Sequence, residues 1–298
     1  MATITQSTKF PAQLEKEIFN AVKGKSAIAA LCPAEPIPFA GKDIFVFSMP
    51  NEVSVLGESA AKPAGDAAIT SVPIRPVKVV YQSRVTAEFM YASEEAQLNT
   101  LATFAEGFSR KLAKGLDIMA GFGLNPATGS ASGVIGNNHL SYAIANYASG
   151  ANQVEYAEGT DDPVGALEEA ISKVDDMNGI ILGTDLREDI AALKATSGGG
   201  QPAFPEFAFG GAPAKLGAAD LAVTNNLAAG TYAFVGNFDA FRWGFAKELP
   251  LEIIEYGNPD GGTYDLKQAN EVLLRSEAFI GWGILDASEF AAVVADES

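Results

Sequence analysis

Two long periodic segments follow each other almost without a break between residues 77 and 121, and they limit the possible folds more than any other feature. From Val77 to Phe89 apolar and polar residues alternate, which predicts a β-strand with one buried face. At the rise of a β-strand, these thirteen residues would span about 43 Å. This length is unusual for a chain of 298 residues.

A long helix is predicted immediately afterwards. Ser93 is suited to the N-cap, and Glu94 and Glu95 to the first turn, where carboxylates interact favourably with the helix dipole. Apolar residues then recur at intervals of three or four, at Leu98, Leu101, Ala105, Phe108, Leu112, Leu116 and Met119. A helix of about 26 residues would be about 39 Å long, more than twice the usual length. Two such elements extend beyond what one compact core requires, so a neighbouring subunit is expected to cover their exposed edges.

The region before the long strand predicts an arm followed by a hairpin. A short stretch with helical spacing lies within residues 1–35, after which three prolines break any helix. Ile44 to Phe47 reads as a strand. From Val53 to Val72 the chain is apolar, then small and polar from Gly57 to Gly65, then apolar again, which predicts an extended hairpin with a flexible tip.

The region after the long helix predicts a compact α/β part. Glycine, serine and asparagine dominate from Gly121 to Asn138 and end the helix. The further expected elements are a helix capped by Thr160 or Asp161 with Pro163 in its first turn, a buried strand at 180–182, a short helix opened by a capping box at Asp185–Glu188 and running to Leu193, and strands at 232–235, 249–255 and 272–285, the last with a possible bulge at Gly281 and Gly283.

Composition excludes several classes of protein. The chain is 48% hydrophobic and carries 20 basic against 37 acidic residues, a net charge of −17, so it is folded but lacks the basic surplus of a nucleic-acid-binding protein. If DNA lies nearby, this acidic surface is not expected to bind or condense it. No apolar run reaches the roughly 18 residues of a membrane span, and the N-terminus does not read as a signal peptide. Cys32 and His139, each the only residue of its type, form neither a disulfide nor a four-ligand zinc site; they are expected in the core and in a surface loop.

The motifs of common enzymes fail when they are examined. The segment Gly129–Gly133 has Ala131 where a nucleophile elbow needs serine, and Gly198–Gly200 lacks the lysine of a phosphate loop. The acidic pairs at 161–162 and 175–176 fit solvated helix ends better than a cation site. No catalytic, cofactor-binding or metal-binding residue is therefore assigned, and no cofactor is expected. A carboxylate-dependent hydrolase with a site near Asp161 and Asp185 is kept as a less favoured alternative.

The order of these parts resembles the major capsid protein family of tailed bacteriophages, with the Hong Kong 97 type capsid fold. The resemblance covers nearly the whole chain, and it rests on the order of the motifs more than on any one of them. The local similarities are Phe122–Gly129 leading to Gly133–Gly136, Ile180–Arg187 with Leu193-Lys194, Thr231–Phe238, Arg275–Glu277 and Ile284–Phe290.

The resemblance implies an α+β fold and a division of the chain. The implied parts are an N-terminal arm at 1–35, an extended hairpin loop and its base at 36–80, a peripheral domain with its spine helix at 81–126, an axial α/β domain at 127–240, a return to the peripheral domain at 241–285, and a C-terminal segment at the axial domain at 286–298.

The resemblance also implies function. The chain would self-assemble into pentamers and hexamers of an icosahedral shell around double-stranded DNA, without sequence-specific DNA binding or membrane attachment, in the host cytoplasm, and would end in the virion capsid. A separate scaffolding protein and a portal are the expected partners, because the arm is short. The expected inter-subunit contacts lie in the hairpin, at Val55, Leu56, Glu58, Lys62, Asp66 and Ile69. Some relatives cross-link a loop lysine, but an ordinary solvated Lys62 is favoured. An encapsulin-like cargo compartment is the alternative within the same fold.

Overall fold

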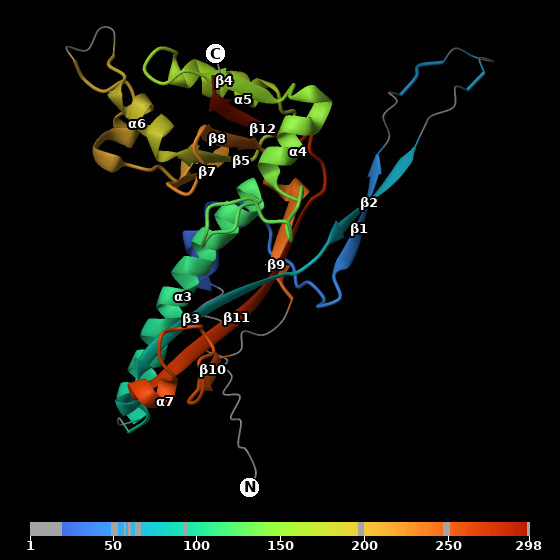
Figure 1. Cartoon of the computed structure of the whole chain (residues 1–298). Helices are drawn as coiled ribbons and strands as arrows, with labels where there is room; N and C mark the ends of the chain where they lie inside the picture. The colour runs from blue at the N-terminus through green and yellow to red at the C-terminus, as the bar shows by residue number, and fades with distance from the viewer. Residues whose placement is uncertain are drawn as a thin grey trace.

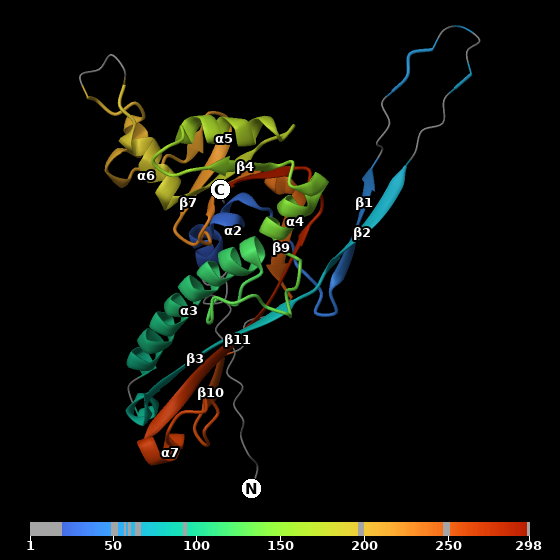
Figure 2. The same cartoon turned by 45° about the horizontal axis from the view of Figure 1, so that its top comes forward.

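The structure is a computed structural model that describes residues 20–48, 53–56, 58, 61–62, 67–91, 94–195, 200–246 and 251–296. It is an elongated mixed α+β molecule with three parts (Figure 1). A six-stranded sheet with helices on both faces forms one end, a four-stranded sheet beside the long helix α3 forms the other, and a two-stranded hairpin projects sideways. Figure 2, turned by 45°, shows the same separation of the hairpin from the rest of the molecule.

The elements of the elongated part and of the hairpin come mostly from the first half of the chain. In chain order they are α2 (Ala27–Leu31), β1 (Lys42–Ser48), β2 (Ala68–Ile74), β3 (Val77–Thr86), the 3-10 turn η1 (Ala87–Tyr91), α3 (Glu94–Phe122), β9 (Phe241–Phe245), β10 (Leu251–Ile254), α7 (Leu266–Ala269) and β11 (Glu271–Ile284). The residues 20–25 are also helical.

The remaining elements form the six-stranded end. They are α4 (Leu140–Asn146), η2 (Tyr147–Ser149), β4 (Gln153–Tyr156), α5 (Pro163–Ser172), β5 (Gly179–Gly183), α6 (Thr184–Ala192), η3 (Pro205–Gly210), β6 (Lys215–Leu216), β7 (Ala219–Thr224), β8 (Thr231–Gly236), η4 (Phe238–Ala240) and β12 (Phe290–Ala295). The strand order is β4-β12-β8-β5-β7-β6, with β12–β4 and β5–β7 parallel and the other pairs antiparallel.

The central strands of this sheet are buried on both faces and separate two cores. Ile180 and Leu182 of β5 face α5 and α6, whereas Ile181 faces the core that contains α2, α3 and α4. The alternation follows from the two-residue repeat of a strand. The buried strand predicted at 180–182 is confirmed, and every residue of β5 is buried.

The two long elements that the sequence predicts are both present. Helix α3 has 29 residues, which corresponds to about 43 Å. It ends where Gly123 adopts a φ of +68° and its N–H bonds to the Met119 carbonyl at 2.9 Å. A Cβ at this glycine would lie 2.4 Å from Cδ2 of His139, so no other residue fits. The predicted cap, Ser93, lies outside the described residues.

Strand β3 is shorter than predicted, because it ends at Thr86 and not at Phe89. Its partner β11 begins at Glu271, which pairs with Thr86, and the chain before it turns away at Asn270 with a φ of +57°. Beyond Thr86 no partner strand is available, and Ala87 N–H bonds instead to the Asn270 carbonyl at the start of η1. Alternation in sequence cannot show where a partner ends.

The long return strand is confirmed as β11, but the bulge predicted at Gly281 and Gly283 is wrong. The pairing of β11 with β9 runs in continuous register from Ile280 to Ile284. The two glycines are needed for packing, because a Cβ on Gly283 would lie 2.7 Å from Cγ1 of Ile74, and one on Gly281 would lie 3.0 Å from Cδ1 of Ile37.

Two predicted helix caps also need correction. The side chain that caps α5 is Asp162, which accepts from Val164 N–H at 3.1 Å, whereas Asp161 accepts from Ala157 N–H in the preceding turn. The capping box predicted at Asp185 is absent, because β5 runs straight into α6 and the N-cap is Gly183, which has no side chain to donate or accept. The predicted short helix otherwise matches α6, which ends at Ala192.

Candidate subunit-contact surface

The hairpin of β1 and β2 is held to the body only at its base. The two strands pair antiparallel from Lys42–Ile74 to Ser48–Ala68. At the base, Ile74 is 1% exposed and packs against the glycines of β11, and the ring of Phe39 meets that of Phe279 edge to face at 5.0 Å. Beyond this anchor the strands leave the molecule (Figures 1 and 2).

Charged groups complete the anchor. Glu35 accepts from Lys42 Nζ at 2.9 Å and lies 3.3 Å from Nε of Arg242, so one carboxylate joins the start of β1 to β9. The hydrogen bond from Lys42 lowers the pKa of Glu35 below its ordinary value. Arg75 and Asp43 form a second ion pair at 2.8 Å across the base of the hairpin. The base is therefore fixed, whereas the strands beyond it lack support.

One face of the hairpin carries apolar side chains that no described part of the subunit covers. Phe45 and Phe47 of β1 are 73% and 58% exposed, and Ile69, the partner of Phe47, is 69% exposed. An uncovered apolar surface of this kind marks a protein interface or an aggregation hazard. We call these three residues the apolar strip. The sequence predicted the strands but not this exposure, because aromatic residues read equally well as core.

The predicted contact residues can now be located. Val55 is fully exposed at 100% and Leu56 at 43%, and Glu58 and Lys62 are exposed as well. Ile69 belongs to the apolar strip, whereas Asp66 lies outside the described residues. The five described candidates thus belong to one projecting hairpin and are free of contacts within the subunit that would bury them.

A groove lies between the long helix and the long strand on the body. It has a volume of about 530 Å³ and is lined by parts of β3, α3 and the loop that follows α3, with Tyr81, Phe108, Leu112, Met119 and Val134 supplying apolar surface. Lys78, Lys111 and Lys114 also line it, and Lys78 is paired with Glu277 at 2.6 Å. The molecule therefore has both an apolar hairpin that projects from it and an apolar groove on its body.

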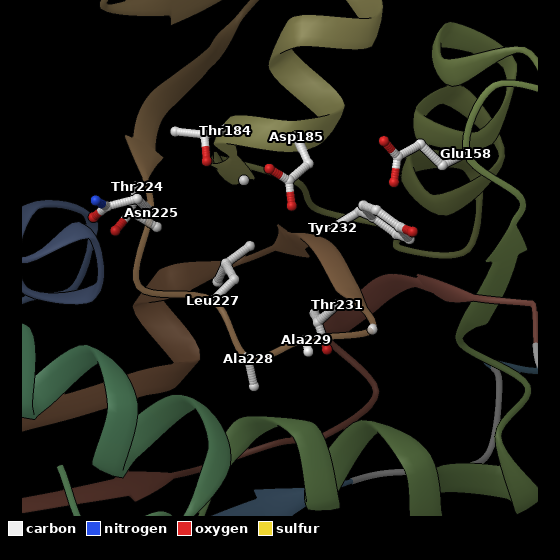
Figure 3. A pocket seen from close by; sticks show the side chains of 12 residues that line it. Glu158, Thr184, Asp185, Thr224, Asn225, Leu227, Ala228, Ala229, Thr231 and Tyr232 are labelled. Carbon is white, nitrogen blue, oxygen red and sulfur yellow. The ribbon is translucent and has the colours of Figure 1, made fainter. Parts of the chain in front are cut away.

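The two acidic residues proposed for a hydrolase are not brought together. Asp185 lines a pocket of about 260 Å³ with Glu158, Thr184 and Tyr232, as Figure 3 shows, but Asp161 does not line it and bonds to Ala157 N–H instead. Within the described part of the chain, no group of three His, Cys, Asp or Glu residues is placed to hold a metal ion. The hydrolase alternative thus loses the pair on which it rested.

The lone cysteine and histidine have structural positions, as predicted. Cys32 is 2% exposed, burial raises the pKa of its thiol well above the ordinary value, and its carbonyl accepts from Nε1 of Trp243. His139 lies half-buried in the loop before α4 and caps this helix through Nδ1, which accepts from Tyr142 N–H at 3.2 Å. Among the described helices none is long and apolar enough to cross a bilayer.

Comparison with solved structures identifies the family of this chain. No protein-family profile matches the sequence, and no curated protein matches it. A structure from Mycobacterium phage Ogopogo is similar to 91% of this chain and 92% of its own, with 30% sequence identity and a TM-score of 0.74. One from Gordonia phage Cozz covers 92% of this chain and 87% of its own at 20% identity and a TM-score of 0.71.

A third similar structure is described as a capsid. The capsid of an empty gene-transfer-agent (GTA) particle covers 91% of this chain and 90% of its own at 11% identity, with a TM-score of 0.63, and it shows the fold alone. The likeness at 30% identity over nine-tenths of both chains is close enough to establish membership. The chain belongs to the major capsid protein family of tailed bacteriophages, with the Hong Kong 97 type fold, and is a structural protein of the icosahedral virion shell rather than an enzyme.

Proposed function

We propose that this subunit assembles with copies of itself into pentamers and hexamers, and that its hairpin lies across the neighbouring subunit in the shell that encloses double-stranded DNA. The observation that carries the proposal is the apolar strip of Phe45, Phe47 and Ile69, which is exposed on a ribbon anchored only at its base. A contact between a hairpin on one subunit and a different surface on the next is heterologous, and it closes into rings when the rotation permits.

The groove between β3 and α3 is the surface that we assign to the neighbour's hairpin. Tyr81, Phe108 and Leu112 give it apolar surface that suits the apolar side chains of the hairpin, and Glu58 near the hairpin tip is a further proposed contact. Val55, Leu56, Lys62, Asp66 and Ile69 remain proposed contacts on the same hairpin. Burial of such apolar area contributes roughly 25 cal/mol per Å² before the costs of association are subtracted.

The division of the chain is proposed on the same basis. The proposed parts are the arm at 1–35, the hairpin and its base at 36–80, the peripheral domain at 81–126 with its return at 241–285, and the axial domain at 127–240 with the segment 286–298. The separation of the hairpin, the four-stranded sheet and the six-stranded sheet supports this division. We further propose a separate scaffolding protein and a portal as partners of the shell.

A deletion tests the proposal. A variant without residues 57–65 keeps the paired strands and the whole core, so we expect a subunit that folds but forms no shells. Lys62→Gln is the matched control, because it removes only a charge and a potential cross-link; it should form shells that resist heat and detergent as the wild type does. Electron microscopy and circular dichroism of both variants measure these outcomes.

Normal shells from the deletion variant would contradict the role of the hairpin. Weakened Lys62→Gln shells would instead show that Lys62 itself contributes to the contact between subunits, and denaturing electrophoresis of the wild-type shells would show whether that contact is covalent. A copurifying enzyme in place of DNA would favour the encapsulin-like compartment.

A further inference from the structure

Four lysines stand out on a subunit whose net charge is −17. Lys23 and Lys25 belong to or end the helical segment 20–25, and Lys111 and Lys114 lie on α3; all four are exposed. Within the described part of the chain none of them forms an ion pair, although most of the other basic residues there do. We call these four residues the lysine face.

Two buried contacts bring the halves of the lysine face together. Val22 is fully buried in the same core as the inward side of α3, and Ala27 N–H and Ser26 Oγ donate to the carboxylate of Asp117. Lys25 is therefore next to Ser26, which bonds to Asp117 of α3, about one turn beyond Lys114. The lysines of α3 point away from the core, because Leu112 and Leu116 occupy the opposite, buried side of the helix.

Among the described residues around the lysine face, the carboxylates are few and engaged with other partners. The residues 118–154, which supply the loop beside Lys111 and Lys114, contain no Asp, Glu, Lys or Arg. Glu106 is paired with Arg110 one turn away, and Asp117 is buried with its oxygens occupied by hydrogen bonds. Within the described part of the chain, the charge of the four lysines is thus not neutralised by a neighbouring carboxylate.

The exposed residues around the lysine face indicate whether it suits DNA or an acidic protein segment. On the solvent side of the two helices they are small or polar, such as Gly24, Ala102 and Gly107, whereas the apolar Tyr81 and Val134 lie toward the groove with β3; the solvent side thus has no aromatic anchor of the kind that dominates protein interfaces. A phosphate backbone can be bound by flexible cationic side chains that come close to it. Lysine provides a point charge of this kind and does not distinguish one base sequence from another. A smooth lysine surface suits duplex DNA better than an acidic protein segment.

We propose that the lysine face is a sequence-independent contact surface for the phosphate backbone of double-stranded DNA. The inference rests on the proposed function, which places such DNA inside the shell. It replaces the expectation, drawn from net charge alone, that the shell wall confines DNA without contacting it. Net charge concealed the cluster because its two halves are far apart in sequence.

The test compares two double substitutions that change the net charge equally. Lys111→Gln/Lys114→Gln removes half of the lysine face, whereas Lys194→Gln/Lys215→Gln removes two exposed lysines from the six-stranded end. Binding of unassembled full-length subunits to a short fluorescent DNA duplex is measured by anisotropy over a salt series. Each phosphate contact contributes about −0.9 to the slope of log K against log salt concentration.

We expect the wild type to show a slope of up to about −3.6, the first variant a slope smaller in magnitude by about 1.8, and the control variant the wild-type slope. Equal losses in the two variants, or no loss in the first, would overturn the inference. A first variant that binds DNA normally but loses a copurifying acidic scaffolding protein would also overturn it, in favour of that partner.

Shell formation separates this inference from the proposed function. The shell yield of both variants is measured beside the titration. Because Lys111 and Lys114 also line the groove assigned to the neighbour's hairpin, a lower shell yield of the first variant would support that contact, whereas the titration with unassembled subunits decides the DNA contact independently. Absence of shells even from the wild type would contradict the proposed function, while the titration with unassembled subunits would still decide the DNA contact.

Discussion

Ser26 and Asp117 are separated by 91 positions in the chain, yet the Ser26 hydroxyl donates a hydrogen bond of 2.6 Å to Oδ1 of Asp117 in the interior. The same carboxylate accepts from the backbone N–H groups of Ala27 and Ile28, both at 3.2 Å, and from Nδ2 of Asn226 at 3.1 Å. It thereby caps α2, fixes it to α3 and reaches the loop between β7 and β8. One side chain, 3% exposed, organises three segments of the subunit.

Removal of this carboxylate should be among the most destabilising single changes. Asp117→Ala leaves buried donors of Ser26, Ala27 and Ile28 without acceptors, and we expect a loss of at least about 3 kcal/mol in the free energy of unfolding. Ser26→Ala, which removes one cap, should cost about 1 kcal/mol. Urea unfolding of the unassembled subunit measures both, and an Asp117→Ala variant as stable as Ser26→Ala would refute this role of the carboxylate.

The same site predicts a pH dependence. Burial raises the pKa of Asp117 above its ordinary value, against the opposing effect of its hydrogen bonds. A raised pKa in the folded state means that the favourable contribution is complete below the ordinary pKa of about 4 and is lost as the pH rises through the raised value. Asp117→Asn does not titrate, so the stability advantage of the wild type over this variant should shrink from about pH 4 upward. An advantage that grows over this range would contradict the prediction.

Two glycine substitutions should have opposite effects. A Cβ on Gly244 of β9 would lie 1.7 Å from the Glu35 carbonyl oxygen, where the chain after α2 forms a bridge to Trp243. Gly244→Ala must therefore displace backbone, and we expect it to prevent stable folding. Gly107→Ala, on the exposed side of α3 with nothing within 4 Å, should raise the unfolding free energy by about 1 kcal/mol. Thermal unfolding of both variants tests the pair.

The apolar strip should matter to assembly and not to the subunit. Phe47→Ser and Ile69→Ser change exposed side chains, so we expect the unfolding free energy to stay within about 0.5 kcal/mol of the wild type while the yield of shells falls. Thr70→Ala, on the opposite face of the same strand, is the control and should assemble normally. Loss of shells with Thr70→Ala alone would place the contact on the other face.

The sequence predicted the parts whose periodicity is long and unbroken. The apolar stripe from Leu101 to Met119 identified α3, and the alternation around Trp282 identified β11, because one helix face or one strand face is buried along its whole length. Strand β9 was missed although Phe241, Trp243 and Phe245 alternate there, since the run is only five residues long. Short elements lack enough repeats to be distinguished from loops.

Other features depend on contacts that sequence reasoning does not see. The bulge assigned to Gly281 and Gly283 was wrong because the reason for these glycines is the distant side chain of Ile74. The lysine face was missed for the same reason, since the segment that carries Lys23 meets the helix that carries Lys111 only through the buried Val22 and the hydrogen bonds to Asp117. The exposure of Phe45 and Phe47 could not be predicted from residues that are equally common in cores.

Negative-stain electron microscopy of the purified protein, expressed alone and together with its neighbouring genes, tests the central claim most directly. Uniform polyhedral shells or capsomer rings are the predicted result. Only small particles of one size in both samples would contradict the assignment of this chain to shell assembly.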